Sequence, residues 1–201
     1  MLAFLNCEHI NKLLDKLDLI NHSFNKRIDL DKHIDLDKVK KAIFYAKKYH
    51  SNQKRDTGEP YYMHPLEVAR MVGYYSFETD TIITAILHDT LEDTTLTKEK
   101  IVKVFGKKIA EQVSDLTRIN DNKKISSREM IQTFYRQNKT ELLLIKLFDR
   151  FHNIQTVSIK PYEKRQEIIL ETQQEFIPLA EYLKLPEIAI ELNKYCKLYA
   201  T

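Results

Sequence analysis

Tryptophan is absent from this chain of 201 residues, and glycine (three), proline (five) and cysteine (two) are scarce. Because turns between strands depend on glycine and proline, their scarcity favours helices over a sheet protein. Cys7 and Cys196 stand near opposite ends of the chain without a CxxC spacing. This placement argues against a disulfide framework or a thiolate zinc site, and free thiols are typical of a reducing cytosol.

The chain also lacks a strong excess of one charge and a long apolar run. There are 32 basic and 29 acidic side chains, a net charge of +3, which is too balanced for a surface that coats nucleic acid. The longest dense apolar run, Leu142 to Phe148, contains Lys146 and is far shorter than a membrane span. The amino terminus has no signal-peptide pattern. We therefore predict a cytoplasmic protein that binds neither nucleic acid nor membrane.

Apolar residues recur at intervals of three and four along nearly the whole chain, which predicts an all-α fold built as a compact multi-helix bundle. We expect residues 1–35 to form an N-terminal helix and a polar linker, and residues 36–201 to form the main domain of a single globular protein. Asp35 or Asp37 is the expected cap of the helix that follows the linker. Helices are predicted over residues 2–20, 36–50, 97–117, 126–138, 140–158, 162–183 and 186–199.

The segment IITAILHDTLEDT (82–94) ends an apolar helix face abruptly in His88, Asp89, Glu92 and Asp93. Residues 88 and 92 share one face of a helix, as do 89 and 93. An imidazole and three carboxylates so close together are costly unless a positive group lies among them. A divalent cation is the natural candidate, and the alternative is an exposed helix end with incidental charges.

Two further positions strengthen the metal hypothesis. His64 directly precedes Pro65, and Asp149 follows the apolar run LLLIKLF. Each has a plainer alternative, since His64 fits a surface or capping residue and Arg150 is available as an ion-pair partner for Asp149. Mixed imidazole and carboxylate ligands suit manganese, iron or zinc. The candidate ligands are His64, His88, Asp89 and Asp149.

The order H…HD…D resembles the HD superfamily of metal-dependent phosphohydrolases. A fuller pattern resembles the hydrolase domain of the RelA/SpoT alarmone enzymes over about residues 36 to 185, and HDTLEDT is its most specific part. The segments that carry it are HSNQKR (50–55), TGEPYYMHPLEVA (57–69), AILHDTLEDT (85–94), FGKKIAEQVSDLT (105–117) and IKLFDRFHNIQTV (145–157).

This resemblance implies an HD-domain bundle with the metal site between central helices, in which His64, His88, Asp89 and Asp149 hold one Mn²⁺ per chain. It implies that Glu92 and Asp93 orient and deprotonate the attacking water. The implied reaction is removal of the 3′-pyrophosphate from ppGpp or pppGpp, which yields GDP or GTP and pyrophosphate.

The resemblance also implies that Arg55 contacts the nucleotide and that Asn153 and Thr156 line its pocket. The family commonly has a second basic residue after Arg55, whereas this chain has Asp56. A carboxylate at that position weakens anion capture, and Lys54 is the candidate to take the place of the missing cation.

Two alternatives remain open because of Asp56 and because no synthetase domain follows residue 201. One is an HD phosphohydrolase acting on another nucleotide, such as NADPH or a nucleoside phosphate. The other is a non-catalytic alarmone-binding remnant. The residues also leave open whether the chain is a stand-alone small alarmone hydrolase or a fragment of a longer enzyme, and whether it forms homo-oligomers.

Overall fold

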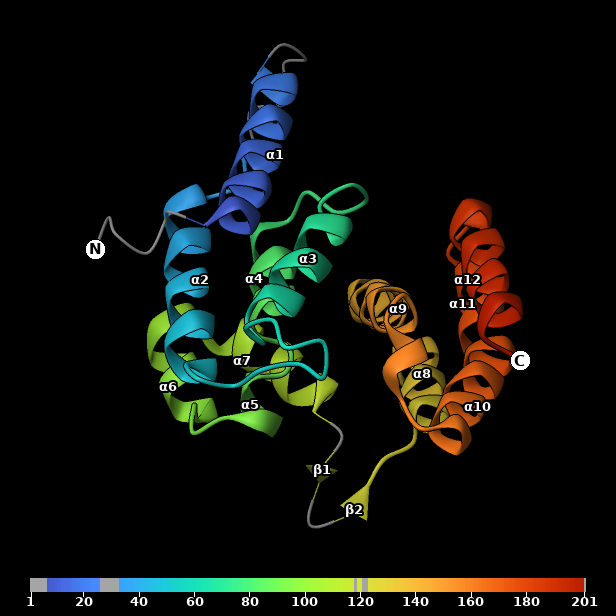
Figure 1. The fold of residues 1–201 in the computed structure, drawn as a ribbon. Coiled ribbons are helices and arrows are strands. Elements are labelled where there is room, and N and C mark those ends of the chain that lie inside the picture. Colours follow the sequence, from blue (N-terminus) through green and yellow to red (C-terminus); the bar gives the residue numbers. More distant parts are fainter. Residues whose placement is uncertain (1–6, 26–32, 118, 121–122, 201) are drawn as a thin grey trace. The chain divides into compact units, whose positions relative to one another are not determined.

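A computed structural model of the protein describes residues 7–25, 33–117, 119–120 and 123–200, and its regular structure is almost entirely helical (Figure 1). This confirms the predicted all-α class. The helices are α1 (Glu8–Asn25), α2 (Leu36–His50), α3 (Met63–Val72), α4 (Thr79–Leu87), α5 (Thr90–Asp93), α6 (Lys98–Phe105), α7 (Lys107–Leu116), α8 (Ser127–Arg136), α9 (Thr140–Ile154), η2 (Val157–Ile159), α10 (Tyr162–Glu171), η3 (Thr172–Phe176), α11 (Ile177–Tyr182) and α12 (Pro186–Tyr199). Two-residue strands β1 (Ile119–Asn120) and β2 (Lys123–Lys124) pair antiparallel.

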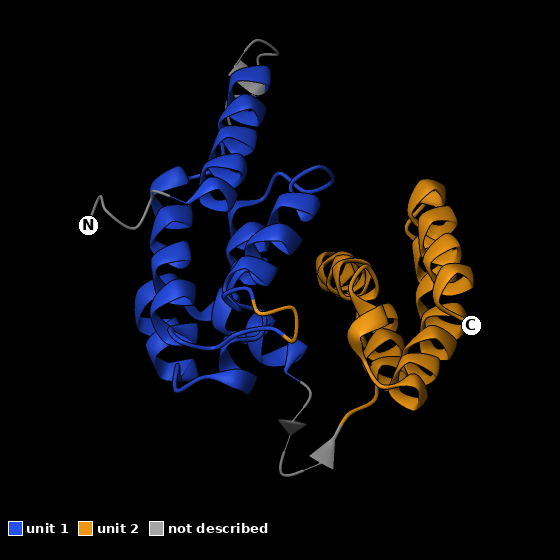
Figure 2. Cartoon of the chain, in the orientation of Figure 1, with its two compact units in different colours: residues 1–55, 59–124 blue, residues 56–58, 125–201 orange. Residues whose placement is uncertain are grey.

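The chain divides into two compact units (Figure 2). Unit 1 comprises the described parts of residues 1–55 and 59–124, and unit 2 comprises those of residues 56–58 and 125–201. The predicted division between an N-terminal segment (1–35) and a main domain (36–201) is not the boundary between these two units, and it stays a prediction. Among the described residues, no helix is both long enough and apolar enough to cross a bilayer.

In unit 1, α4 is the central helix. Every residue from Thr81 to Leu87 is buried, and α4 contacts α2, α3 and α7. This follows from its composition, because a helix that is apolar on nearly every side is covered on every side. The helix ends at Leu87, so the next residues, His88 and Asp89, follow directly from the unit's most buried helix.

Helix α1 packs on α3 and α2. Ile10, Leu13 and Leu17 on one face of α1 are fully buried. Near its end, the buried amide of Asn21 donates from Nδ2 to the carbonyl of Ile34 at 2.9 Å and accepts from the Ile34 backbone N–H at 2.8 Å. Both backbone groups of Ile34 are thereby satisfied, and the chain just before α2 is fastened to α1.

Helix α2 begins and ends where the sequence pattern predicts. Asp35 caps it, because its Oδ1 accepts a hydrogen bond from the backbone N–H of Lys38 at 2.9 Å. This is the usual way in which an aspartate satisfies an otherwise unbonded N–H group of the first turn.

The prediction of one continuous helix over residues 97–117 is wrong. Helix α6 ends at Phe105 and α7 begins at Lys107, with Gly106 between them at φ 97°. A residue with a Cβ rarely adopts this positive φ, whereas glycine does so readily. The glycine therefore ends α6 and allows α7 to begin in a new direction.

In unit 2, α9 contacts α8 and α12, and a π-turn, η3, joins α10 to α11. A π-turn changes the regular hydrogen-bond pattern of a helix. The carbonyl of Ile168, which accepts the backbone N–H of Thr172, also accepts from Thr172 Oγ1 at 2.7 Å and from Arg150 Nη1 at 3.5 Å. Arg150 also forms an ion pair with Glu171, so this buried arginine braces the start of the π-turn.

Candidate metal centre and catalytic site

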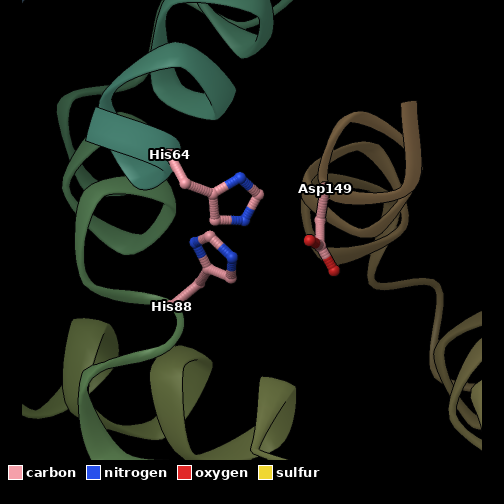
Figure 3. A group of neighbouring side chains, drawn as sticks. All are labelled: His64, His88 and Asp149. Carbon is pink, nitrogen blue, oxygen red and sulfur yellow. The ribbon is translucent and has the colours of Figure 1, made fainter. Parts of the chain in front are cut away.

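Two buried histidines lie together in unit 1. His64 is the second residue of α3, and His88 directly follows α4. Only 2% and 4% of their surfaces are exposed, and their ring centroids are 5.4 Å apart (Figure 3). The end of the most buried helix and the start of its neighbour thus bring these two rings together from positions 24 residues apart.

The carboxylate of Asp89 faces both rings. His88 Nε2 lies 3.1 Å from Asp89 Oδ1, and His64 Nε2 lies 3.6 Å from Asp89 Oδ2. His88 Nδ1 is 2.7 Å from the carbonyl of Ala85. Because a carbonyl only accepts, Nδ1 carries the proton, and in the neutral ring Nε2 presents a lone pair.

A lone pair facing a carboxylate requires a proton or a cation between them. A histidine whose Nδ1–H is bonded to a backbone carbonyl is also the usual form of a metal-ligating imidazole. The donor set of His64, His88 and Asp89 therefore fits a divalent metal of the transition series.

Asp149, the remaining predicted ligand, lies on α9 in unit 2. Figure 3 draws His64 and His88 of unit 1 and Asp149 of unit 2, whose imidazole nitrogens and carboxylate oxygens are each of a kind that ligates metal ions. Both oxygens of Asp149 accept hydrogen bonds within its own helix: Lys146 Nζ donates to Oδ2 at 3.0 Å, and Asn153 Nδ2 donates to Oδ1 at 2.6 Å. The orientation of this carboxylate is thus fixed by two side chains of the same helix, one a turn before it and one a turn after it.

The acidic pair Glu92 and Asp93 lies on the short helix α5, directly after the histidine–aspartate cluster. Partial burial raises the pKa of Asp93, and the negative charges of Asp89 and Glu92 raise it further, while a hydrogen bond from Tyr61 acts in the opposite direction. A concentration of negative charge that disfavours ionisation in this way is relieved by a bound cation.

Tyr61 is a residue of this site that the sequence analysis missed. Its hydroxyl lies 3.0 Å from Asp89 Oδ2 and 3.0 Å from Asp93 Oδ2. Burial and these two carboxylates raise its pKa far above the ordinary value, so the phenol keeps its proton as a donor. The available signal was its position three residues before His64 in TGEPYYMHP, which does not reveal its partners.

His50 and Gln53 support the same region. The His50 ring stacks on Tyr61 with centroids 4.8 Å apart and planes inclined by 26°. His50 Nδ1 donates to Gln53 Oε1 at 2.7 Å, and Gln53 Nε2 donates to the backbone carbonyl of Asp93 at 2.6 Å. Burial lowers the pKa of His50, which agrees with a neutral ring.

The predicted nucleotide-binding residues Lys54 and Arg55 lie in the loop between α2 and α3. Lys54 and Pro60 form an isolated antiparallel bridge, and the Arg55 backbone N–H donates to the carbonyl of Glu59 at 3.0 Å. Arg55 Nε lies 3.6 Å from Glu59 Oε1. The arginine is therefore held by its backbone and its side chain within a narrow hairpin-like loop.

The unusual Asp56 forms an ion pair with Lys160, a residue that follows η2 in unit 2. The other predicted pocket residue, Thr156, lies just before η2, with its hydroxyl 3.4 Å from the carbonyl of Asn153. The carboxylate that departs from the family pattern thus has a nearby cation, which moderates its effect on an anionic ligand.

The chain is similar in sequence to known proteins. The chain is 36% identical over 168 residues to a protein of Myxococcus xanthus named GTP pyrophosphokinase, with 79% of this chain and 22% of the relative covered. It is 37% identical over 169 residues to the guanosine-3′,5′-bis(diphosphate) 3′-pyrophosphohydrolase of Aquifex aeolicus, with 81% and 24% covered. The chain spans less than a quarter of the length of these two relatives.

A solved structure, described as a metazoan ortholog of SpoT that hydrolyses ppGpp, has the same fold. Its TM-score is 0.65 at 20% sequence identity, and the match covers 78% of this chain and 94% of that one. The predicted resemblance is therefore confirmed in sequence and in fold. The model of the HD domain family matches residues 42–185, a range that contains every predicted site residue, and the chain belongs to the HD domain family.

Proposed function

We propose that this protein is a metal-dependent phosphohydrolase that removes the 3′-pyrophosphate from ppGpp and pppGpp. The observation that carries this proposal is the convergence of His64, His88 and Asp89, with Asp93 beside them on α5. The substrate is suggested by the name of the Aquifex aeolicus relative, a guanosine-3′,5′-bis(diphosphate) 3′-pyrophosphohydrolase.

The metal would be one Mn²⁺ per chain, held by His64, His88, Asp89 and Asp149. When bound, such an ion lowers the pKa of a water molecule and offsets negative charge on a phosphate group. The imidazole nitrogens and carboxylate oxygens of these residues are ligands that manganese accepts.

In the proposed reaction, Asp93 accepts a proton from the attacking water while Glu92 orients that water. The water oxygen bonds to the phosphorus that is attached to the ribose 3′ oxygen. The bond between this phosphorus and the 3′ oxygen then breaks. The 3′ oxygen takes up a proton and becomes the hydroxyl of GDP or GTP, and pyrophosphate leaves.

Substrate binding in this proposal rests on four residues. The Arg55 guanidinium pairs with phosphate oxygens, a geometry for which its planar donors are well suited, and Lys54 adds a second positive charge. Asn153 and Thr156 would line the nucleotide pocket, with Asn153 also holding Asp149 through its 2.6 Å hydrogen bond.

The direct test is release of pyrophosphate and GDP from ppGpp by metal-stripped protein, with and without added Mn²⁺. Asp89→Ala and Glu92→Ala should each abolish turnover while far-ultraviolet circular dichroism stays unchanged. Glu99→Ala, on the neighbouring helix α6, is the matched control and should retain activity. Turnover that persists in both site variants would contradict the proposal.

Asp56 and its ion pair with Lys160 favour testing a second function, hydrolysis of another nucleotide. NADPH and a nucleoside monophosphate should be assayed beside ppGpp at the same concentrations of protein and Mn²⁺. A larger kcat/KM for one of them would assign the site to that substrate. Stoichiometric binding of ppGpp and Mn²⁺ without turnover would instead indicate a binding protein.

A further inference from the structure

The Tyr61 hydroxyl joins two carboxylates that have different proposed roles. It lies 3.0 Å from Oδ2 of Asp89, a proposed metal ligand, and 3.0 Å from Oδ2 of Asp93, the proposed acceptor of the water proton. All three residues belong to unit 1. Tyr61 therefore contacts both the proposed metal ligand and the proposed proton acceptor.

A phenol has one O–H proton, so it donates a full hydrogen bond to only one of the two carboxylates at a time. The two contacts are equally long, so this one proton is shared between Asp89 Oδ2 and Asp93 Oδ2. The hydroxyl can thus hold the two carboxyl groups close together although their charges repel each other.

Asp93 is held at a second point by another residue of the same loop as Tyr61. Gln53 Nε2 donates to the backbone carbonyl of Asp93 at 2.6 Å, and Gln53 Oε1 accepts from His50 Nδ1 at 2.7 Å. The His50 ring in turn stacks on Tyr61. The side chain and the backbone of Asp93 are thus both fastened to one connected group of three residues.

We propose that Tyr61 is a positioning residue of the hydrolytic site, whose hydroxyl holds Asp89 in place for the metal ion and Asp93 in place for the attacking water. This inference rests on the proposed function for the role of Asp93. Its consequence for metal binding is independent of the substrate, since Asp89 needs the same orientation whatever nucleotide is cleaved.

The test is Tyr61→Phe, which removes the hydroxyl and keeps the ring that stacks on His50. We expect the Kd for Mn²⁺, measured by calorimetry on metal-stripped protein, to rise about tenfold, and kcat for ppGpp to fall about 10- to 100-fold, the usual effect of removing a residue that orients a metal ligand. KM should change by less than about threefold, because the hydroxyl does not contact the nucleotide in this proposal.

The matched control is Tyr62→Phe. Tyr62 is the adjacent tyrosine, it is 8% exposed, and its hydroxyl has a weak bond to Cys7 Sγ at 3.8 Å. This variant should keep the wild-type Kd for Mn²⁺ and the wild-type kcat, so it separates the loss of a hydroxyl at this site from the loss of a buried hydroxyl in general.

An unchanged Kd for Mn²⁺ in Tyr61→Phe would overturn the inference, whatever its turnover. If the wild-type protein released no pyrophosphate from ppGpp, the proposed function would fail by itself. The comparison of Mn²⁺ affinity between the two phenylalanine variants would still decide the role of Tyr61.

Discussion

Lys146 Nζ lies 3.0 Å from Asp149 Oδ2, and only 6% of the lysine side chain and 14% of the aspartate side chain are exposed. The two residues stand one turn apart on α9, inside unit 2. A largely buried carboxylate without a cation nearby is costly, so this lysine balances the charge of Asp149.

Replacement of Lys146 by methionine should therefore destabilise the metal-free protein. We expect a loss of about 3 kcal/mol, the usual cost of removing one partner of a buried ion pair, seen as a melting temperature lower by about 6–12 °C. Added Mn²⁺ should raise the melting temperature of this variant more than that of the wild type, because the ion replaces the missing charge.

The matched control for this prediction is Lys164→Met. Lys164 forms an ion pair of the same i,i+3 spacing with Glu167 on α10, but both side chains are more than half exposed. Its loss should cost less than about 1 kcal/mol. Equal melting temperatures for the two variants would show that burial does not strengthen the Lys146 pair.

Asn153 has two proposed roles, the positioning of Asp149 and the binding of the nucleotide, and its replacement tests both. Because its Nδ2 holds Asp149 Oδ1 at 2.6 Å, Asn153→Ala should weaken Mn²⁺ binding and lower kcat, each by about tenfold. KM should also rise, because the amide lines the proposed nucleotide pocket. Titration calorimetry and steady-state kinetics measure these quantities, and Asn193→Ala on α12 is the control. A raised KM with unchanged metal affinity would instead assign Asn153 to the nucleotide alone.

Asn21 fastens α1 to the rest of unit 1 through its two hydrogen bonds to Ile34. Asn21→Ala leaves a buried N–H and a buried carbonyl without these partners, so the free energy of unfolding should fall by about 2 kcal/mol. Urea denaturation measures it. Ser23→Ala removes a bond to Leu19 within the same helix at an exposed position and should have little effect; equal losses in the two variants would contradict this role for Asn21.

Asp56 should weaken the capture of an anionic nucleotide next to Arg55, and Lys160 pairs with it. Asp56→Asn removes the negative charge and frees the lysine, so KM for ppGpp should fall by about two- to fivefold, in line with the modest strength of exposed pairs. The gain should shrink at high salt. Asp37→Asn on α2 controls for net charge, and an unchanged or higher KM for Asp56→Asn would refute the prediction.

The sequence by itself was sufficient wherever the determining contacts are local. The bounds of α2 and its cap at Asp35 follow from helical periodicity and a side chain that bonds three residues ahead. The grouping of His88 with Asp89 and the acidic pair follows from their adjacency at the end of an apolar helix. Gly106 could also have been read as the break between α6 and α7, because glycine commonly ends a helix.

Contacts between distant segments depended on the tertiary structure. Tyr61 contacts carboxylates that are 28 and 32 residues away, and Gln53 contacts a carbonyl 40 residues away. Periodicity shows which residues share a face of one helix, but it does not show which loop packs against the end of that helix. The sequence alone therefore determined which groups are the candidates for the chemistry, whereas only the packing of the loop before α3 against α5 decided which residues hold Asp89 and Asp93 in place.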